Sequence, residues 1–300
     1  MDIKKFINDP KYYALIALGK ILPDKLWADK LYLHMLYKNR MGKQLNLQNP
    51  VTYNEKLQWM KLYDRNDKYT MLVDKYAVKK YVADILGEEY IIPTLGAWNS
   101  FQEIDFDSLP NQFVLKCTHD SGGLVICTDK SSFNADNAKN KIEHALRRKY
   151  YKNTREWPYM NVKPRIIAEQ YMVDESGYEL KDYKFFVFNG VMKAMFVATD
   201  RTANSETCFD FYDRNFNHLP FINGHPNSKG HINKPNNYEE MIALAERLGS
   251  GLPQARVDLY NIRGRIYFGE ITFFHWSGLK PFIPDEWDYT FGSWFDLSNI

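Results

Sequence analysis

The stretch from Gln254 to Leu279 constrains the fold most strongly, because two short runs within it alternate polar and apolar residues. The apolar positions are odd-numbered and include Val257 and Ile271. The polar positions are even-numbered: Arg256, Asp258, Glu270 and Thr272. A two-residue period indicates a strand with one buried face. Because residues 261–264 have the composition of a turn, the pattern predicts an antiparallel hairpin.

The polar face of this hairpin carries two carboxylates. If the turn has an odd number of residues, Asp258 and Glu270 project from the same face, with Arg256 beside them. Two carboxylates that close repel each other unless a cation lies between them, and such oxygen ligands suit Mg²⁺, which also binds substrate phosphates. The alternative is a surface hairpin whose polar face is only hydrated. The hairpin by itself does not decide between the two.

The composition is that of a soluble globular protein, with 300 residues of which 45% are hydrophobic and 25% charged. This length supports a sizeable core in one or two domains and excludes a disordered or fibrous chain. A net charge of +2 predicts no nucleic-acid partner. The three unclustered cysteines predict reduced thiols and a cytoplasmic location.

The first 72 residues are expected to form helices. An apolar run at residues 12–18 is too short to cross a bilayer, so we expect it to pack against the core, with an interfacial helix as the alternative. Membrane association is therefore an open alternative that this sequence pattern does not indicate. Thr52 and Glu55 have the spacing of a capping box, which predicts a helix start. Another helix is predicted over residues 25–38 by the spacing of its apolar side chains: Leu26, Trp27, Leu31, Leu33 and Leu36.

A second informative stretch is residues 111–128, where two short apolar runs flank the turn His119–Gly123. We expect strands at residues 113–117 and 124–127, and backbone N–H groups of such a glycine-rich turn can bind phosphate oxygens. Most turns of this kind are only turns. Lys116 is more informative, because an unpaired ammonium group in an apolar strand is costly.

The middle of the chain predicts further strands. Residues 166–172 form an apolar run that carries Glu169, and Asn189-Gly190 is a strong signal for a hairpin turn between the runs that flank it. Asp182, Lys184, Asp200 and Arg201 lie at the outer ends of that hairpin. Helices and antiparallel strands together indicate an α+β fold.

These segments together resemble the TupA-like ATP-grasp family of bacterial surface-polysaccharide gene clusters. The similarity is carried by TYNEKLQWMKLYDRND at 52–67, DKYAVKKYV at 74–82 and FVLKCTHDSGG at 113–123. The resemblance implies an α+β ATP-grasp fold, in which two subdomains grip a nucleotide and a helical N-terminal region precedes them. The implied divisions are residues 1–72, residues 73–168 with the lysines and glycine-rich loop, and residues 169–300 with the metal-binding core.

The resemblance also implies ATP and Mg²⁺ as cofactors and a role for each candidate residue. Binding of the nucleotide would use a set of basic, acidic, loop and hinge positions: Lys75, Lys116, Ser121, Gly122, Gly123, Glu169, Gln170, Met172, Asp182, Lys184 and Arg201. Lys116 and Arg256 would assist phosphoryl transfer. The metal ligands would be Asp258, Glu270 and Thr272, where threonine replaces the usual asparagine.

The implied reaction is ATP-dependent ligation of a carboxylate to an amine through an acyl phosphate. The implied substrate is a sugar acid or amino acid of a capsule or cell-wall polymer, and we expect Trp276, His275 and Lys280 to line its pocket. One alternative is a glycosyltransferase that uses a nucleotide sugar, since paired acids also hold metal diphosphates. Another is a non-catalytic scaffold that retains the fold. The sequence does not specify the oligomeric state.

Overall fold

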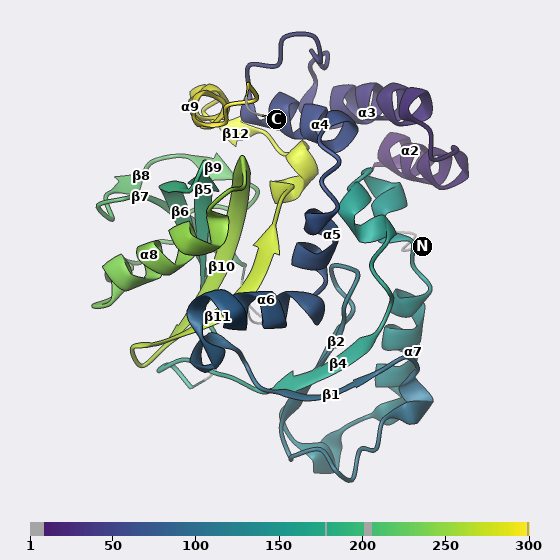
Figure 1. Ribbon diagram of the computed structural model, residues 1–300, viewed down its shortest axis with the longest axis vertical. Helices are drawn as coiled ribbons and strands as arrows, with labels where there is room; N and C mark the ends of the chain where they lie inside the picture. The colour runs from purple at the N-terminus through teal and green to yellow at the C-terminus, as the bar shows by residue number, and fades with distance from the viewer. Residues whose placement is uncertain (1–8, 178, 201–205, 299) are drawn as a thin grey trace.

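The computed structural model describes residues 9–177, 179–200, 206–298 and 300, and it contains two main antiparallel sheets (Figure 1). The smaller sheet has the strand order β1-β4-β2-β3, and the larger has the order β11-β10-β5-β6-β7-β8. A two-stranded ribbon pairs β12 (Phe282–Ile283) with β9 (Ile222–Asn223). The mixture of helices with antiparallel sheets confirms the predicted α+β class.

The smaller sheet contains β1 (Thr94–Trp98), β2 (Phe113–Cys117), β3 (Leu124–Cys127) and β4 (Ile166–Gln170). The strands predicted at 113–117 and 124–127 are confirmed. Helix α7 (Ala135–Leu146) packs against this sheet through Ile142 and Ala145, which join an apolar cluster with Leu115 and Cys117. The predicted domain boundary after residue 168 falls inside β4, so this sheet extends the second division to Gln170.

The larger sheet contains β5 (Asp182–Phe188), β6 (Val191–Thr199), β7 (Cys208–Asp213), β8 (His218–Leu219), β10 (Gln254–Ile262) and β11 (Arg265–Thr272). The β5–β6 turn is Asn189-Gly190, as predicted, and both residues have positive φ, 48° and 77°. Every residue of β5 is buried, because α8 (Tyr238–Gly249) covers one face and the opposite face is packed by aromatic side chains. This sheet forms the main core of the molecule.

The β10–β11 hairpin differs from the prediction in how its polar face arises. The turn has two residues, Arg263-Gly264, with φ values of 52° and 84°, and not an odd number. A two-residue turn alone would pair Asp258 with Gly269. A bulge at Gly269 shifts the register, so that Asp258 lies opposite Glu270 and Arg256 opposite Thr272. The predicted shared face is therefore present, and the bulge produces it.

The N-terminal helices are α2 (Pro10–Ile21), α3 (Leu26–Met41), α4 (Tyr53–Tyr63), α5 (Lys68–Val73) and α6 (Ala77–Leu86), and α9 (Glu286–Trp294) packs beside α4. Thr52 and Glu55 form the predicted capping box at the start of α4. Helical spacing located α3, but Leu26, Trp27 and Leu31 are exposed, and the buried face is formed by its other apolar side chains. None of the described helices is both long and apolar enough to cross a membrane.

Candidate nucleotide and acceptor site

The glycine-rich turn after β2 is held by a buried carboxylate. Asp120 is 1% exposed, accepts a hydrogen bond from the Gly123 N–H at 3.2 Å, and pairs with Arg148 at 2.5 Å. A side chain at Gly123 would lie 2.7 Å from the Asp120 carboxylate, so the close packing here requires glycine. Lys75 donates to the Asp120 carbonyl at 2.8 Å, which places its ammonium group beside the turn. The predicted lysine and loop are thus brought together.

Lys116 on β2 forms an ion pair, which explains how its ammonium group is tolerated in an apolar strand. Its ammonium group lies 2.5 Å from Glu169 Oε2, and Lys79 lies 2.5 Å from Glu169 Oε1. The two lysines outweigh the effect of burial and lower the pKa of Glu169 below its ordinary value. Both oxygens of Glu169 are engaged, so its side chain orients Lys116, and adenine recognition at the predicted hinge would fall to backbone groups.

Asp258 belongs to the polar face of β10 but is covered by neighbouring side chains. Cations bind both of its carboxylate oxygens. Arg256 donates to Oδ1 at 2.7 Å and to Oδ2 at 2.8 Å, and Lys184 on β5 donates to Oδ2. Lys184 also pairs with Asp182 at 2.5 Å. Asp258 is 1% exposed, so it acts on the site through Arg256 and Lys184, which reach the cavity surface.

Glu270 is the carboxylate of this hairpin that remains open, with its side chain 39% exposed. It lies 3.4 Å from Arg256 and 3.8 Å from Lys75. Partial burial opposes ionisation, yet Lys75, Lys184 and Arg256 outweigh it and lower the pKa of Glu270 to about 2. Glu270 is therefore fully ionised at neutral pH.

The donor set fits a Mg²⁺ ion that is bound mainly by phosphate oxygens and water. Thr272 Oγ1 lies 3.4 Å from Glu270 Oε1, so one carboxylate and one hydroxyl face the same space. Within the described residues there is no cluster of three or more histidine, cysteine or acidic side chains that could enclose a metal. Mg²⁺ commonly uses one or two carboxylates together with substrate phosphates. Glu270 and Thr272 would hold the ion.

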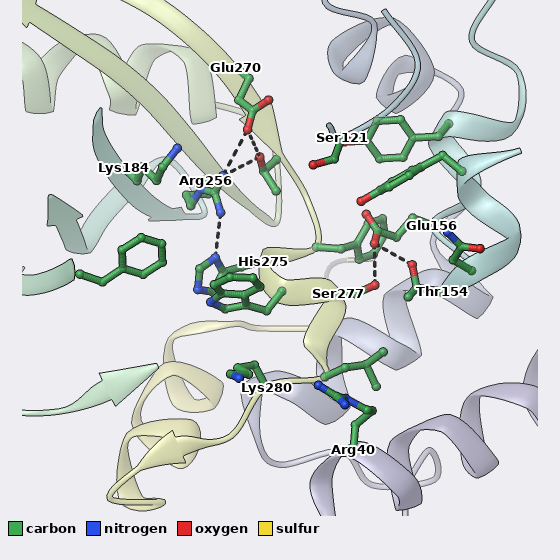
Figure 2. A pocket seen from close by; sticks show the side chains of 18 of the residues that line it. Arg40, Ser121, Thr154, Glu156, Lys184, Arg256, Glu270, His275, Ser277 and Lys280 are labelled. Carbon is green, nitrogen blue, oxygen red and sulfur yellow. Dashed lines mark hydrogen bonds and ion pairs between the residues drawn. The ribbon is translucent and has the colours of Figure 1, made fainter. Parts of the chain in front are cut away.

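Arg256 is fixed from its other side by His275. The guanidinium donates to His275 Nδ1 at 2.8 Å, so the ring proton is on Nε2, which donates to Asn223 at 2.9 Å. Burial, together with Arg256 and Lys184, holds the pKa of His275 well below its ordinary value. His275 lines the same cavity as Arg256, and Figure 2 shows the hydrogen bond between the two side chains; the other ring nitrogen of His275 is bonded to Asn223.

Two cavities meet at the hairpin. The first, of about 330 Å³, lies between the glycine-rich turn and the larger sheet. It is lined by most of the predicted nucleotide residues, Lys75, Lys116, Ser121, Gly122, Gly123, Glu169, Asp182 and Lys184, and by the predicted metal ligand Glu270. The second, of about 530 Å³, contains Arg256, Thr272, His275, Trp276 and Lys280 in its wall. Lys75, Ser121, Lys184 and Glu270 line both cavities, so they mark the junction.

The second cavity also contains groups that the sequence reasoning missed. Glu156 is 4% exposed and accepts hydrogen bonds from Ser277 at 2.5 Å and Thr154 at 2.9 Å (Figure 2). Lys61 on α4 donates to the Ser277 hydroxyl at 3.1 Å, and burial lowers the pKa of Lys61 to about 7. Burial raises the pKa of Glu156. The loop that carries Glu156 contains no sequence motif. Only its hydrogen bond with Ser277, which is 121 positions away, shows that Glu156 belongs to the site.

The Ser277 turn itself is unusual. Trp276, Ser277 and Gly278 have consecutive positive φ values of 48°, 60° and 61°. Two of the three are not glycine, and such a conformation persists only where neighbouring groups hold it. Gln58 and Lys61 on α4 supply those contacts, because both donate to the Ser277 carbonyl, at 2.9 and 2.7 Å. The turn presents Trp276 to the second cavity, as predicted.

A few predicted residues are not at the junction. Gln170, the last residue of β4, is exposed, and Met172 in the segment that follows is half-buried; neither lines the two cavities. Asp258 is covered, as described above. Arg201 lies outside the described residues.

Comparison with known proteins gives the family of the chain. No curated protein matches the chain significantly. Among solved structures, D-alanine–D-alanine ligase from Bacillus anthracis complexed with ATP is 14% identical with a TM-score of 0.39, covering 68% of this chain and 54% of that one. The Helicobacter pylori ligase is 16% identical with a TM-score of 0.40, covering 75% and 63%. The ATP-grasp ligase PsnB with precursor, Mg and ADP is 10% identical with a TM-score of 0.39, covering 73% and 57%.

The chain thus spans between 54% and 63% of the length of these solved structures. The family model described as TupA-like ATPgrasp matches residues 55–296. That match agrees with the predicted enzyme class, a ligase that uses ATP with Mg²⁺. Because it covers most of the chain, the protein belongs to the TupA-like ATP-grasp family, and its two-sheet α+β architecture is the ATP-grasp fold.

Proposed function

We propose that the protein joins a carboxylate to an amine at the expense of ATP, through an acyl phosphate. The observation that carries this proposal is the junction of the two cavities at Lys75, Ser121, Lys184 and Glu270. A ligase of this type needs a nucleotide pocket and an acceptor pocket that meet where the phosphoryl group is transferred. The first cavity would hold ATP, and the second would hold the acceptor.

The basic side chains have clear tasks in such a reaction. An acceptor carboxylate oxygen would attack the γ-phosphorus, the bond to the bridging oxygen would break, and ADP would leave. Lys75, Lys116 and Arg256 would offset the charge of the phosphoryl oxygens. Mg²⁺ bound by Glu270 would withdraw further charge from the phosphates. The amine nitrogen would then attack the acyl carbon, and phosphate would leave as the nitrogen loses a proton.

The second cavity supports an anionic acceptor. Arg40 and Lys280 lie in its wall together with aromatic side chains, including Phe209 and Trp276, whose rings stack at 6.0 Å. Cations beside flat apolar faces suit a sugar acid or an amino acid. We propose such a substrate, a precursor of a capsule or cell-wall polysaccharide, and a cytoplasmic site of reaction.

Calorimetric titration with Mg-ATP tests the nucleotide site directly. Wild-type protein should bind Mg-ATP, and Lys116→Ala should weaken that binding at least about tenfold, because a charge-assisted contact to phosphate is removed. Lys80→Ala is the matched control, since Lys80 is an exposed lysine paired with Asp84 on α6. UDP-glucose serves as the competing ligand and should give no heat.

Binding would be followed by ADP release in the presence of uronic acids and amino acids, with hydroxylamine to trap an acyl phosphate. Heat from UDP-glucose but none from Mg-ATP would contradict the ligase proposal and favour the glycosyltransferase. Mg-ATP binding without ADP release from any acceptor, and with full biological activity of Glu270→Lys, would favour the scaffold.

A further inference from the structure

Four large apolar side chains are exposed around the turn that joins α2 and α3. The exposed fractions are 80% for Ile21, 52% for Leu26, 63% for Trp27 and 51% for Leu31. All four lie within residues 21–31, and the turn lies at the outer edge of the molecule (Figure 1). Apolar side chains that are exposed singly are ordinary, but four of this size in so short a segment indicate an interaction surface.

This exposure does not result from a poorly packed helix. The opposite face of α3 is fully buried through Tyr32, Leu33 and Leu36, which form an apolar cluster with Leu279. Trp27 and Leu31 are one helical turn apart, so they share the outward face. The hairpin of α2 and α3 is therefore anchored on one side and apolar on the other.

The charges around the apolar surface are mostly positive, and the one exposed acid of residues 20–31, Asp24, has a side chain that is 41% exposed and paired with a lysine. Lys20, Lys25 and Lys30 are exposed and alternate with the apolar side chains along the chain. The two nearby acids are engaged elsewhere. Asp24 lies 2.6 Å from Lys152 and accepts from the Tyr151 hydroxyl at 2.9 Å. Asp29 is buried against Arg155 at 2.8 Å.

We propose that this docking surface, formed by Ile21, Leu26, Trp27 and Leu31 with Lys20, Lys25 and Lys30, binds the protein to an anionic membrane. A bilayer with acidic headgroups matches both features at once. Its headgroup layer attracts the lysines, and the acyl boundary accepts tryptophan and leucine side chains. The helices need only lie in the interface, which agrees with their length.

The docking surface is connected to the second cavity by the same two helices. Tyr12 on α2 and Arg40 on α3 line that cavity, and the Arg40 guanidinium lies 4.7 Å from the Tyr12 ring centre. The tip of the helical hairpin would thus bind lipid while its other end forms part of the acceptor wall. The membrane proposal does not depend on the nucleotide chemistry, and its test uses no nucleotide.

Co-sedimentation with vesicles tests the proposal. Wild-type protein should bind vesicles of phosphatidylcholine with about 30% phosphatidylglycerol, and bind pure phosphatidylcholine at least about tenfold more weakly. About 0.5 M NaCl should reduce the binding, because the lysines are solvent-exposed. The double variant Trp27→Ser/Leu31→Ser should bind the anionic vesicles at least about tenfold more weakly.

Leu95→Ser/Ile126→Ser is the matched control, because both residues are exposed apolar side chains on the smaller sheet. It should bind like wild type. If the Trp27 double variant proves unfolded by circular dichroism, Lys25→Glu/Lys30→Glu replaces it, with the same expected loss. Wild-type protein that stays in the supernatant, or variants that bind as strongly as wild type, would overturn the proposal. So would a dimer in light scattering that the variant abolishes while vesicle binding is unchanged.

Discussion

At the scale of single residues, the site depends on charges held in fixed positions by buried partners. Glu169 orients Lys116, and Asp258 orients both Arg256 and Lys184. Both of these buried carboxylates are paired with two cations, which is the condition under which a charge can be tolerated in a protein interior. The buried carboxylates therefore hold Lys116, Arg256 and Lys184 in fixed positions beside the exposed carboxylate of Glu270.

His275 predicts a pH dependence of stability. Its pKa is held well below 6.5 by burial and by Arg256 and Lys184, whereas an unfolded chain has a histidine of ordinary pKa. As pH falls below about 6.5, His275 binds a proton in the unfolded state but not in the folded state, so the free energy of unfolding decreases. The slope from this one group approaches about 1.4 kcal/mol per pH unit.

The measurement is urea unfolding of wild type and of His275→Asn between about pH 5 and pH 8. The variant should be less stable at pH 8 but should lack the part of the acid dependence that comes from His275. His231→Asn, in an exposed loop, is the control and should follow wild type. Identical slopes for wild type and His275→Asn would show that His275 is protonated in the folded protein.

At the scale of elements, the turn after β11 depends on contacts with α4. Gly278 has φ of 61°, and a side chain there would lie 2.4 Å from Gln58 Nε2 and 2.9 Å from Leu57 Cβ. Gly251 has φ of 72° with no atom within 4 Å of the same position. Gly251→Ala therefore measures only the cost of a side chain at a left-handed backbone position, whereas Gly278→Ala adds the cost of the clash with α4.

We expect Gly251→Ala to lower the free energy of unfolding by about 1 kcal/mol and Gly278→Ala by about 3 kcal/mol. Guanidinium unfolding curves provide the comparison. An equal decrease in the free energy of unfolding for the two variants would mean that α4 shifts to accommodate the new side chain. The contacts with α4 would then not be what holds the turn.

At the scale of the whole molecule, the first cavity, which we propose holds the nucleotide, lies between two sheets, with Lys75, Lys116 and the glycine-rich turn on one side and Glu270 and Lys184 on the other. A ligand that binds only the folded protein stabilises it by an amount that grows with the logarithm of the ligand concentration divided by its dissociation constant. Mg-ATP at about 100 times its dissociation constant should add about 2.7 kcal/mol, which would raise the unfolding midpoint by roughly 5 °C.

Thermal unfolding with ATP in Mg²⁺ or in EDTA measures this effect. The shift should be clearly smaller in EDTA, and Glu270→Gln should show equally small shifts in both conditions. If EDTA left the wild-type shift unchanged, Glu270 would not be a metal ligand.

Local features of the chain were sufficient to predict much of the fold. The capping box at Thr52, the turn at Asn189-Gly190 and the strands on either side of His119–Gly123 depend on neighbouring residues, and each was found where the pattern placed it. The family match also agrees with the order of the motifs. The pairing register of the β10–β11 hairpin could not be predicted in this way, because no local sequence pattern marks the bulge at Gly269.

The sequence by itself determined which segments form helices and strands, because short-range periodicity and turn chemistry depend on adjacent residues. The family followed from the resemblance of whole segments and from the match of the family model. Only the tertiary structure decided which charges meet. Lys79 shares Glu169 with Lys116, Asn223 accepts a hydrogen bond from His275, and Glu156 lines the second cavity and bonds Ser277. These partners are separated by 52 to 121 positions along the chain, and burial then selects the partner that each charge requires.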